Sequence, residues 1–287
     1  MSLSEKLEKV TSELGIGTDT LLSEIAELNR QQDQRKQVYV KDDFNIRNGK
    51  ISLIPLADFH IGNRQACTQK IRSFVDLISR YDHLYTILLG DAAETATRSS
   101  VGLGMYEEDM HLREQLLYLG ELLQPIAQQG KLLGVHTGNH EFRSAVLSGI
   151  NPMEFLASNL NVPYLGYQGF YSLQVGDQVY HMGSTHGMGS GRTTGAKVNV
   201  SERMAQVNPM CHLYLSGHSH IRSVHDGVKY YINQDNQLQS IKQYYVICGS
   251  FLGYFGGYAE QHVLSPSSIG AVQVDLYADS HDVQVIM

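Results

Sequence analysis

The sequence has few cysteines and no long apolar run. Cys67, Cys211 and Cys248 are the only cysteines among its 287 residues, and their odd number and wide spacing do not indicate a disulfide framework. Thiols used in this way are typical of a reducing compartment, so a cytoplasmic location is expected. No apolar stretch approaches the roughly 18 residues that a membrane-spanning helix needs, so no membrane contact is expected. The first nine residues are polar and charged, which is not typical of a signal peptide.

Positive charge is also scarce. The chain has 22 lysines and arginines against 29 acidic residues, for a formal net charge of −7. This balance is unfavourable for a protein whose main task is to hold a nucleic-acid backbone, but it does not exclude an enzyme that acts on one locally. Histidine, in contrast, occurs 13 times, and many of these residues share short segments with Asp, Asn and Gly. The order of these residues therefore has to decide what they do.

Residues 1–43 are expected to form a helical N-terminal extension and a linker, separate from a domain at 44–287. Apolar residues recur at helical spacing over 3–14 and again over 21–28, with a Gly-Ile-Gly break between them. Two short helices around a turn could be a DNA-binding helix-turn-helix. Acidic Glu24 and Glu27 in the second helix favour a packing or oligomerising hairpin instead.

The domain at 44–287 alternates strands and helices and then becomes rich in strands. Early strands are expected at 51–57, 84–89 and 131–136, with helices at 70–80 and 109–129 between them, which predicts a parallel sheet covered by helices. Seven further strands are expected, at 170–175, 178–182, 212–216, 230–233, 244–248, 271–277 and 283–286. The expected fold is therefore α/β, with a second sheet packed on the first and helices outside both.

Five polar segments each follow the end of an expected strand. They read Asp58-Phe59-His60, Gly90-Asp91-Ala92-Ala93-Glu94, Gly138-Asn139-His140-Glu141, Thr185-His186-Gly187 and Gly217-His218-Ser219-His220. Loops at the carboxyl ends of strands in α/β sheets converge on one crevice, so residues far apart in sequence can meet there. The neighbouring glycines let the backbone pass close to a bound ion.

The side chains of these segments suit metal ions. The candidate ligands are Asp58, His60, Asp91, Asn139, His186, His218 and His220. Imidazole, carboxylate and one amide oxygen favour first-row ions such as manganese, iron, zinc or nickel over calcium or magnesium. Seven ligands are too many for one tetrahedral ion, but they suit two ions that share a carboxylate and keep positions for water and substrate. Two divalent ions beside only two carboxylates leave a positive pocket, so an anionic substrate is expected.

The five segments, in this order, resemble those of the calcineurin-like metallophosphoesterase superfamily over about residues 50–225. The resemblance implies a two-sheet β-sandwich flanked by helices, in four layers α/β/β/α, with a dinuclear metal site. The ligands that it implies are Asp58, His60 and His220 for the first ion, Asn139, His186 and His218 for the second, and Asp91 as the bridge.

The resemblance also assigns roles to two residues that are not ligands. His140 would be the general acid that protonates the departing alkoxide, and Glu94 would orient it. Water activated by the ions would be the nucleophile. Three nearby arginines are candidate phosphate clamps or plain surface charges, since guanidinium binds phosphate oxygens in a fork: Arg98, Arg143 and Arg192.

Three further sets of residues allow both a functional and a structural interpretation. Residues 95–108 and 187–197 could be substrate loops or solvated connectors. Four aromatic residues between glycines could stack on a base, but edge-strand packing is favoured for them: Phe251, Tyr254, Phe255 and Tyr258. Three histidines on expected strands are interpreted as structural: His136, His181 and His212.

These patterns predict a metal-dependent hydrolase of phosphate esters, most simply a phosphodiesterase or nuclease-like enzyme, with nucleic acid as one candidate substrate. One alternative is a phosphomonoesterase on a protein or small metabolite. Thr95 stands where protein phosphatases of the superfamily carry an arginine, which counts against a protein substrate. A catalytically silent scaffold is the other alternative, and the intact ligand set with His140 counts against it. The oligomeric state is not predicted.

Overall fold

The computed structural model describes residues 38–97, 108–189, 191, 194–263 and 265–287, with positions 17, 19, 20 and 23. The chain divides into two units, Met1–Val38 and Tyr39–Met287. The helical pair expected at 3–14 and 21–28 therefore lies almost entirely outside the described residues. None of the helices in the described ranges is long and apolar enough to cross a membrane.

One sheet of the second unit has six strands, in the order β13-β12-β2-β3-β4-β5. Its strands are β2 (Lys50–Leu53), β3 (Leu84–Leu88), β4 (Leu132–His136), β5 (Tyr164–Gly166), β12 (Gln273–Tyr277) and β13 (Val283–Ile286). Neighbours from β2 to β5 are parallel, while β12 runs antiparallel to both β2 and β13. The parallel strands place their carboxyl ends, and the polar segments that follow, at one edge of the sheet.

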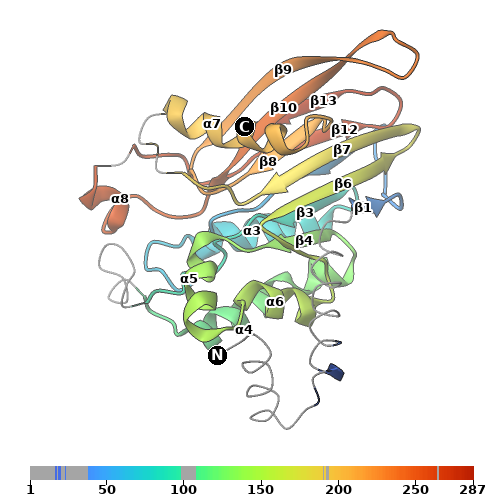
Figure 1. Ribbon diagram of the computed structural model, residues 1–287. Helices are drawn as coiled ribbons and strands as arrows, with labels where there is room; N and C mark the ends of the chain where they lie inside the picture. Colours follow the sequence, from blue (N-terminus) through green and yellow to red (C-terminus); the bar gives the residue numbers. More distant parts are fainter. Residues whose placement is uncertain are drawn as a thin grey trace, which may run out of the picture. The chain divides into compact units, whose positions relative to one another are not determined.

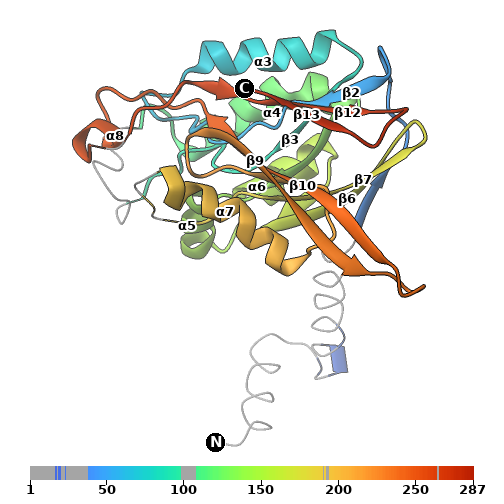
Figure 2. The same ribbon diagram turned by 90° about the horizontal axis from the view of Figure 1, so that it is seen from above.

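The other sheet follows the path β1-β6-β7-β8-β10-β11, with β9 paired to β10. Its strands are β1 (Val38–Lys41), β6 (Gln168–Val175), β7 (Gln178–Thr185), β8 (Leu213–Ser216), β9 (Arg222–Ile232), β10 (Leu238–Ser250) and β11 (Gly270–Ala271). β7 and β8 are parallel, so the segments after them also leave from one edge. Figure 2 shows the long β9–β10 hairpin extending beyond the other strands.

Helices flank both sheets (Figure 1). The helices are α3 (Thr68–Arg80), α4 (Leu112–Gln128), α5 (Asn139–Ser148), α6 (Pro152–Leu160), α7 (Thr194–Val207) and α8 (Tyr258–Gln261). One apolar cluster joins α3, α4 and α6 to the six-stranded sheet, a second fills the space between the sheets, and a third joins α7 to the other sheet. The molecule is thus a mixed α/β structure with two sheets and helices outside them.

Local sequence explains the buried face of α3 and the start of α6. In α3, Ile71, Val75 and Ile78 are buried at helical spacing. α6 starts with Pro152 at its first position, and the Asn151 side chain accepts a hydrogen bond from the Met153 amide, so the helix has a favourable cap.

The expected strands and the two expected helices are present, most with shifted ends, except that the strand expected at 271–277 is divided into β11 and β12 of different sheets. Several elements were missed, β5 among them. Residues 38–41 form β1 although they fall within the extension and linker expected at 1–43, and β9 and β10 are much longer than predicted. α5, α6 and α7 were not predicted. The interpretation of 187–197 as one loop is wrong for its end, because α7 begins at Thr194.

Candidate metal centre

The five polar segments meet where the parallel strands end. Asp58 and His60 follow β2, Asp91 and Glu94 follow β3, Asn139 and His140 open α5 after β4, His186 follows β7, and His218 and His220 follow β8. Three groups of side chains could each hold a metal ion, with donor atoms within 4.8 Å of one another: Asp58–His60–His220, His60–Glu94–His140 and Asp91–His186–His218. Asn139 contacts the last group, so the structure brings all seven candidate ligands together.

The backbone at the candidate ligands is strained. Five of the seven have a positive φ, which non-glycine residues rarely adopt: Asp58 (53°), His60 (51°), Asp91 (48°), His218 (65°) and His220 (53°). Such conformations cost on the order of 1–3 kcal/mol each and cluster at functional sites. The backbone at these residues therefore keeps an unfavourable conformation, and in this conformation their side chains point toward one another.

Glycines allow the loops to approach one another. A Cβ on Gly138 would collide with the Asp91 carboxylate, and a Cβ on Gly217 would lie 2.9 Å from Asp58 Oδ2. Gly90 has a φ of +90° and packs against the Gly138 backbone. These positions require glycine because side chains there would occupy the space of the candidate ligands.

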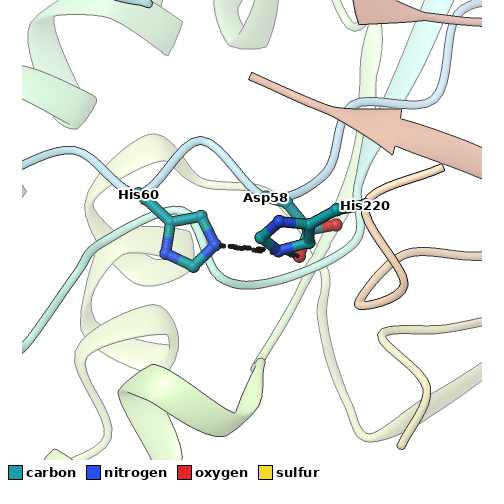
Figure 3. Close-up of side chains that lie close together, drawn as sticks. All are labelled: Asp58, His60 and His220. Carbon is teal, nitrogen blue, oxygen red and sulfur yellow. Dashed lines mark hydrogen bonds and ion pairs between the residues drawn. The ribbon is translucent and has the colours of Figure 1, made fainter. Parts of the chain in front are cut away.

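The first group consists of Asp58, His60 and His220 (Figure 3). His60 Nε2 and His220 Nε2 face each other at 3.2 Å, and His220 Nε2 lies 3.2 Å from Asp58 Oδ1. His60 Nδ1 lies 2.8 Å from Glu94 Oε2, and this contact makes Nδ1 the donor and leaves the lone pair on Nε2. Two nitrogens and an anionic oxygen thus converge on one point.

The second group consists of Asp91, His186 and His218, with Asn139 beside it. His186 Nδ1 donates to the Leu89 carbonyl at 2.8 Å, and His218 Nε2 donates to the Gly189 carbonyl at 2.7 Å. In neutral imidazoles these bonds leave His186 Nε2 and His218 Nδ1 as acceptors. Those two atoms lie 3.3 Å apart, and Asn139 Oδ1 lies 3.0 Å from the first and 2.8 Å from the second.

This arrangement of acceptors fits a cation. His186 Nε2 also lies 3.2 Å from Asp91 Oδ2, so the second group presents four acceptor atoms to one another. In the first group, Asp58 Oδ1 is buried and accepts no hydrogen bond from any described residue. Lone pairs and carboxylate oxygens at these distances repel unless a positive charge lies between them, and buried carboxylates need such a partner.

The pKa values of the groups respond to the same crowding. Burial lowers the pKa of His186, but the Asp91 carboxylate more than compensates and raises it to about 10. Burial would raise the pKa of Asp91, yet His186 and His140 hold it well below its usual value. A proton therefore takes the place of positive charge in this group when no cation is bound.

Glu94 contacts two histidines rather than one. Its carboxylate binds His60 at 2.8 Å, while Oε1 lies 3.3 Å from His140 Nδ1. The hydrogen bond from His140 Nδ1 goes to the main-chain carbonyl of Glu94 at 2.9 Å. His140 Nε2 is turned toward the centre, 3.9 Å from Asp91 Oδ2. The main chain at Glu94 thus orients His140, and its side chain orients His60.

Glu141 is a buried residue to which the sequence analysis gave no role. Its carboxylate accepts hydrogen bonds from the amides of Asp91 (3.1 Å), Ala93 (2.9 Å) and Gly138 (2.9 Å), and so ties the loop after β3 to the start of α5. Burial and the nearby Asp91 raise its pKa to about 7. A glutamate at the third position of a helix is a capping signal that could have indicated this contact.

The three candidate arginines differ in what the structure describes. Arg98 and Arg192 lie outside the described residues. Arg143 is partly buried, and its Nε and Nη2 atoms are inaccessible and have no hydrogen-bond partner. Burial lowers the pKa of His140, but Asp91 and Glu94 more than compensate and raise it to about 9. The Arg143 charge weakly opposes this rise, so the two side chains lie within electrostatic reach. Two of the three guanidinium nitrogens are thus unpaired but shielded from solvent.

The remaining hypotheses from the sequence concern the aromatic residues after β10 and three histidines expected on strands. Phe251 is fully buried and packs edge-on against Phe59 at 5.2 Å, which confirms packing for this residue. Phe255 is 77% exposed, and the Tyr258 side chain lies outside the description. His136 is buried and bonded to Ser184 at 2.8 Å, and His181 stacks on His212 at 5.6 Å, in keeping with structural roles.

No family model and no curated protein matches the chain. Several solved structures resemble it, and two of them do so over 82% of this chain and 87% of their own. One is the Pseudomonas putida nuclease MPE, with 15% sequence identity and a TM-score of 0.34. The other is a hypothetical protein from Pyrococcus horikoshii OT3, with 9% identity and a TM-score of 0.40. Likenesses this weak carry no functional argument, so function has to be argued from the centre itself.

Proposed function

We propose that this chain is a metal-dependent phosphoesterase of the four-layer calcineurin-like type, which hydrolyses phosphodiesters. The observation that carries the proposal is the convergence of acceptor atoms from Asp91, Asn139, His186 and His218, with the unpaired Asp58 oxygen in the neighbouring group. Two divalent ions, manganese in the first instance and iron, zinc or nickel otherwise, suit these donors. When bound, they would supply activated water and neutralise charge on the phosphoryl oxygens.

The residues around the candidate ligands would each have a task in the reaction. As the imidazolium, His140 would carry the proton for the leaving oxygen on Nε2 while its Nδ1–H donates to the Glu94 carbonyl. Glu94 also holds the His60 ring in place. Arg143, which lies within electrostatic reach of His140, would bind a non-bridging phosphate oxygen through its guanidinium group. Arg98 and Arg192 remain candidates for the same task, and Asp91 for the bridge between the ions.

The wider assignments are proposals of the same kind. We take residues 1–43 as an extension and linker and 44–287 as the catalytic domain. Cys67, Cys211 and Cys248 are all free thiols, which supports the cytoplasmic location proposed from the sequence.

The test is to measure metal content and turnover together. Protein reconstituted with Mn²⁺ should bind close to two ions and hydrolyse a bis-aryl phosphodiester faster than an aryl phosphomonoester. His186→Ala should lose about one ion and most turnover, whereas His212→Ala, a histidine outside the three groups, should lose neither. Full turnover in metal-free protein would overturn the proposal.

A further inference from the structure

An exposed aromatic pair lies beside the second group of candidate ligands: Phe142 is on α5, which begins with Asn139, and Tyr167 lies between β5 and β6. The Phe142 and Tyr167 rings meet edge to face, 5.8 Å apart, and remain 45% and 57% exposed. Aromatic rings bury large apolar areas when they can, so a half-exposed pair beside a polar centre is unusual. Neither ring has a role in the hydrolysis proposed above.

Phe142 is fixed relative to the centre by α5. The helix opens with Asn139, so Phe142 and Arg143 are its i+3 and i+4 neighbours. Residues at these spacings share one helix face, with Cβ atoms roughly 5–6 Å apart. The ligand amide, the exposed ring and the unpartnered guanidinium therefore lie side by side on α5, which Figure 1 places at the end of the sheets where the β7 arrow points.

Tyr167 is fixed from the other sheet. In the β6–β7 ladder, Gln168 pairs with Thr185, so Tyr167 is the next residue outward, across from His186. The Thr185 hydroxyl donates to the Tyr167 carbonyl at 2.8 Å and ties the two ends together. Because Asn139 Oδ1 and His186 Nε2 are only 3.0 Å apart, the two rings project from backbone that meets at the second group.

A second exposed aromatic pair lies near the first group. Tyr254 and Phe255 meet edge to face at 5.2 Å, and Phe255 is 77% exposed. Their segment begins where the Phe251 amide donates to the Asp58 carbonyl at 3.0 Å, and the Gly253 amide donates to the Gln65 carbonyl at 2.8 Å. The backbone thus links an aromatic pair to each of the two candidate metal groups.

We infer that the substrate is single-stranded nucleic acid, with the bases on either side of the cleaved phosphate stacked on the Phe142–Tyr167 pair and on Phe255. This inference rests on the proposed function and names its substrate class. Base–aromatic stacking is independent of sequence and works in an acidic protein, because it does not require a basic surface. Arg143 then meets the phosphate of the nucleotide whose base stacks on Phe142.

The competing occupant of this surface is another protein. Val146 and Leu147, further along α5, are 68% and 67% exposed, and a protein partner would cover them together with Phe142. Val146 is the i+4 neighbour of Phe142 and faces the same way, one turn farther from Asn139. It is therefore the matched control: a docked protein would need Val146, and a stacked base would not.

The chain contains no tryptophan, which allows a direct binding measurement. Phe142→Trp introduces a single reporter that keeps a stacking ring, and a stacked base should quench its fluorescence. The probes are a hexathymidylate and an abasic hexamer of the same length. Tyr230→Trp, at a 71% exposed position on the β9–β10 hairpin, serves as the reporter control.

Hexathymidylate should quench Phe142→Trp but not Tyr230→Trp, and the abasic hexamer should quench neither. Phe142→Leu and Phe255→Leu should each raise KM for hexathymidylate about tenfold, whereas Val146→Ser should not change it. Absence of quenching, or equal quenching by the abasic hexamer, would overturn the inference. An equal rise in KM for Val146→Ser, together with a change in its molecular mass in solution, would overturn the inference in favour of a protein partner.

Quenching is measured both with EDTA and with Mn²⁺, which separates the two proposals. Quenching without hydrolysis in the presence of Mn²⁺ would support the stacking site and contradict the phosphoesterase. Hydrolysis of the bis-aryl diester without quenching by hexathymidylate would support the phosphoesterase and contradict the stacking site.

Discussion

At the scale of single residues, the centre combines strain with unsatisfied acceptors. Five candidate ligands hold positive φ angles, and the Asp58 oxygen is buried without a hydrogen-bond donor among the described residues. Both features destabilise the folded chain by itself. They persist because surrounding hydrogen bonds hold the loops in this conformation. Glu141 accepts three of these bonds.

Glu141→Gln should destabilise the metal-free protein by about 1–3 kcal/mol, because an amide nitrogen would face backbone donors that the carboxylate now satisfies. Urea unfolding in EDTA measures the change. Glu121→Gln, at an exposed position on α4, should change the unfolding free energy by less than about 0.5 kcal/mol. Equal unfolding free energies for Glu141→Gln and the parent protein would mean that the three hydrogen bonds do not hold the loops.

His140→Ala should lower turnover of a phosphodiester with a poor leaving group by roughly 10²–10⁴-fold, because the proton donor is removed. A diester with a good leaving group should lose far less, and the metal content should stay near two ions. Turnover and bound metal are measured on the same preparation. Loss of metal in this variant would show that His140 is a ligand.

At the scale of elements, buried polar side chains connect the two sheets at the edge that carries the centre. His136, at the end of β4, donates through Nδ1 to the Gly166 carbonyl at 3.1 Å, so its Nε2 accepts from the Ser184 hydroxyl of β7 at 2.8 Å. Burial, the largest influence, lowers its pKa to about 3. The folded chain therefore keeps this histidine neutral at a pH at which the unfolded chain protonates it.

Because of His136, the unfolding free energy should depend on pH. Below an unfolded pKa of about 6.5 and above the folded pKa, only the unfolded chain takes up the proton, so the unfolding free energy decreases as pH falls. From pH 7.5 to pH 5 the loss from His136 is about 2 kcal/mol. His136→Gln should reduce the total decrease by about that amount in urea unfolding. An unchanged decrease would show that this residue does not titrate as a buried neutral histidine.

At the scale of the whole molecule, the centre draws on both sheets. Asp58, Asp91 and Asn139 follow strands of the six-stranded sheet, while His186 and His218 follow strands of the other. Cations held by side chains from both sheets would therefore bind only the folded unit, and binding that is confined to the folded state stabilises it.

Mn²⁺ at about 100 times its dissociation constant should add about 2.7 kcal/mol of stability per site, or roughly 5 kcal/mol for two sites. In a domain of this size that corresponds to a rise in Tm of roughly 10–20 °C. Calorimetry with Mn²⁺ and with EDTA measures the difference. His186→Ala should show about half the rise, and a rise equal to that of the parent protein would place the metal elsewhere.

Much of the molecule follows from local patterns in the sequence. Apolar runs and helical periodicity placed α3, α4 and the strands of the six-stranded sheet other than β5, because burial of one face leaves a period that can be counted. The five polar segments could be recognised because each follows such a strand. Short or weakly periodic elements such as α5 and α7 could not be found in this way, since tertiary packing rather than periodicity holds them.

The sequence by itself determined which residue types gather at the strand ends, and hence the class of ligand that the centre suits. Only the tertiary structure decided which atoms face one another: that Glu94 supports His60, that Glu141 ties two loops, and that Phe142 and Tyr167 meet beside the second group. These contacts join residues far apart in the chain. Their geometry depends on how the two sheets pack, which no local pattern encodes.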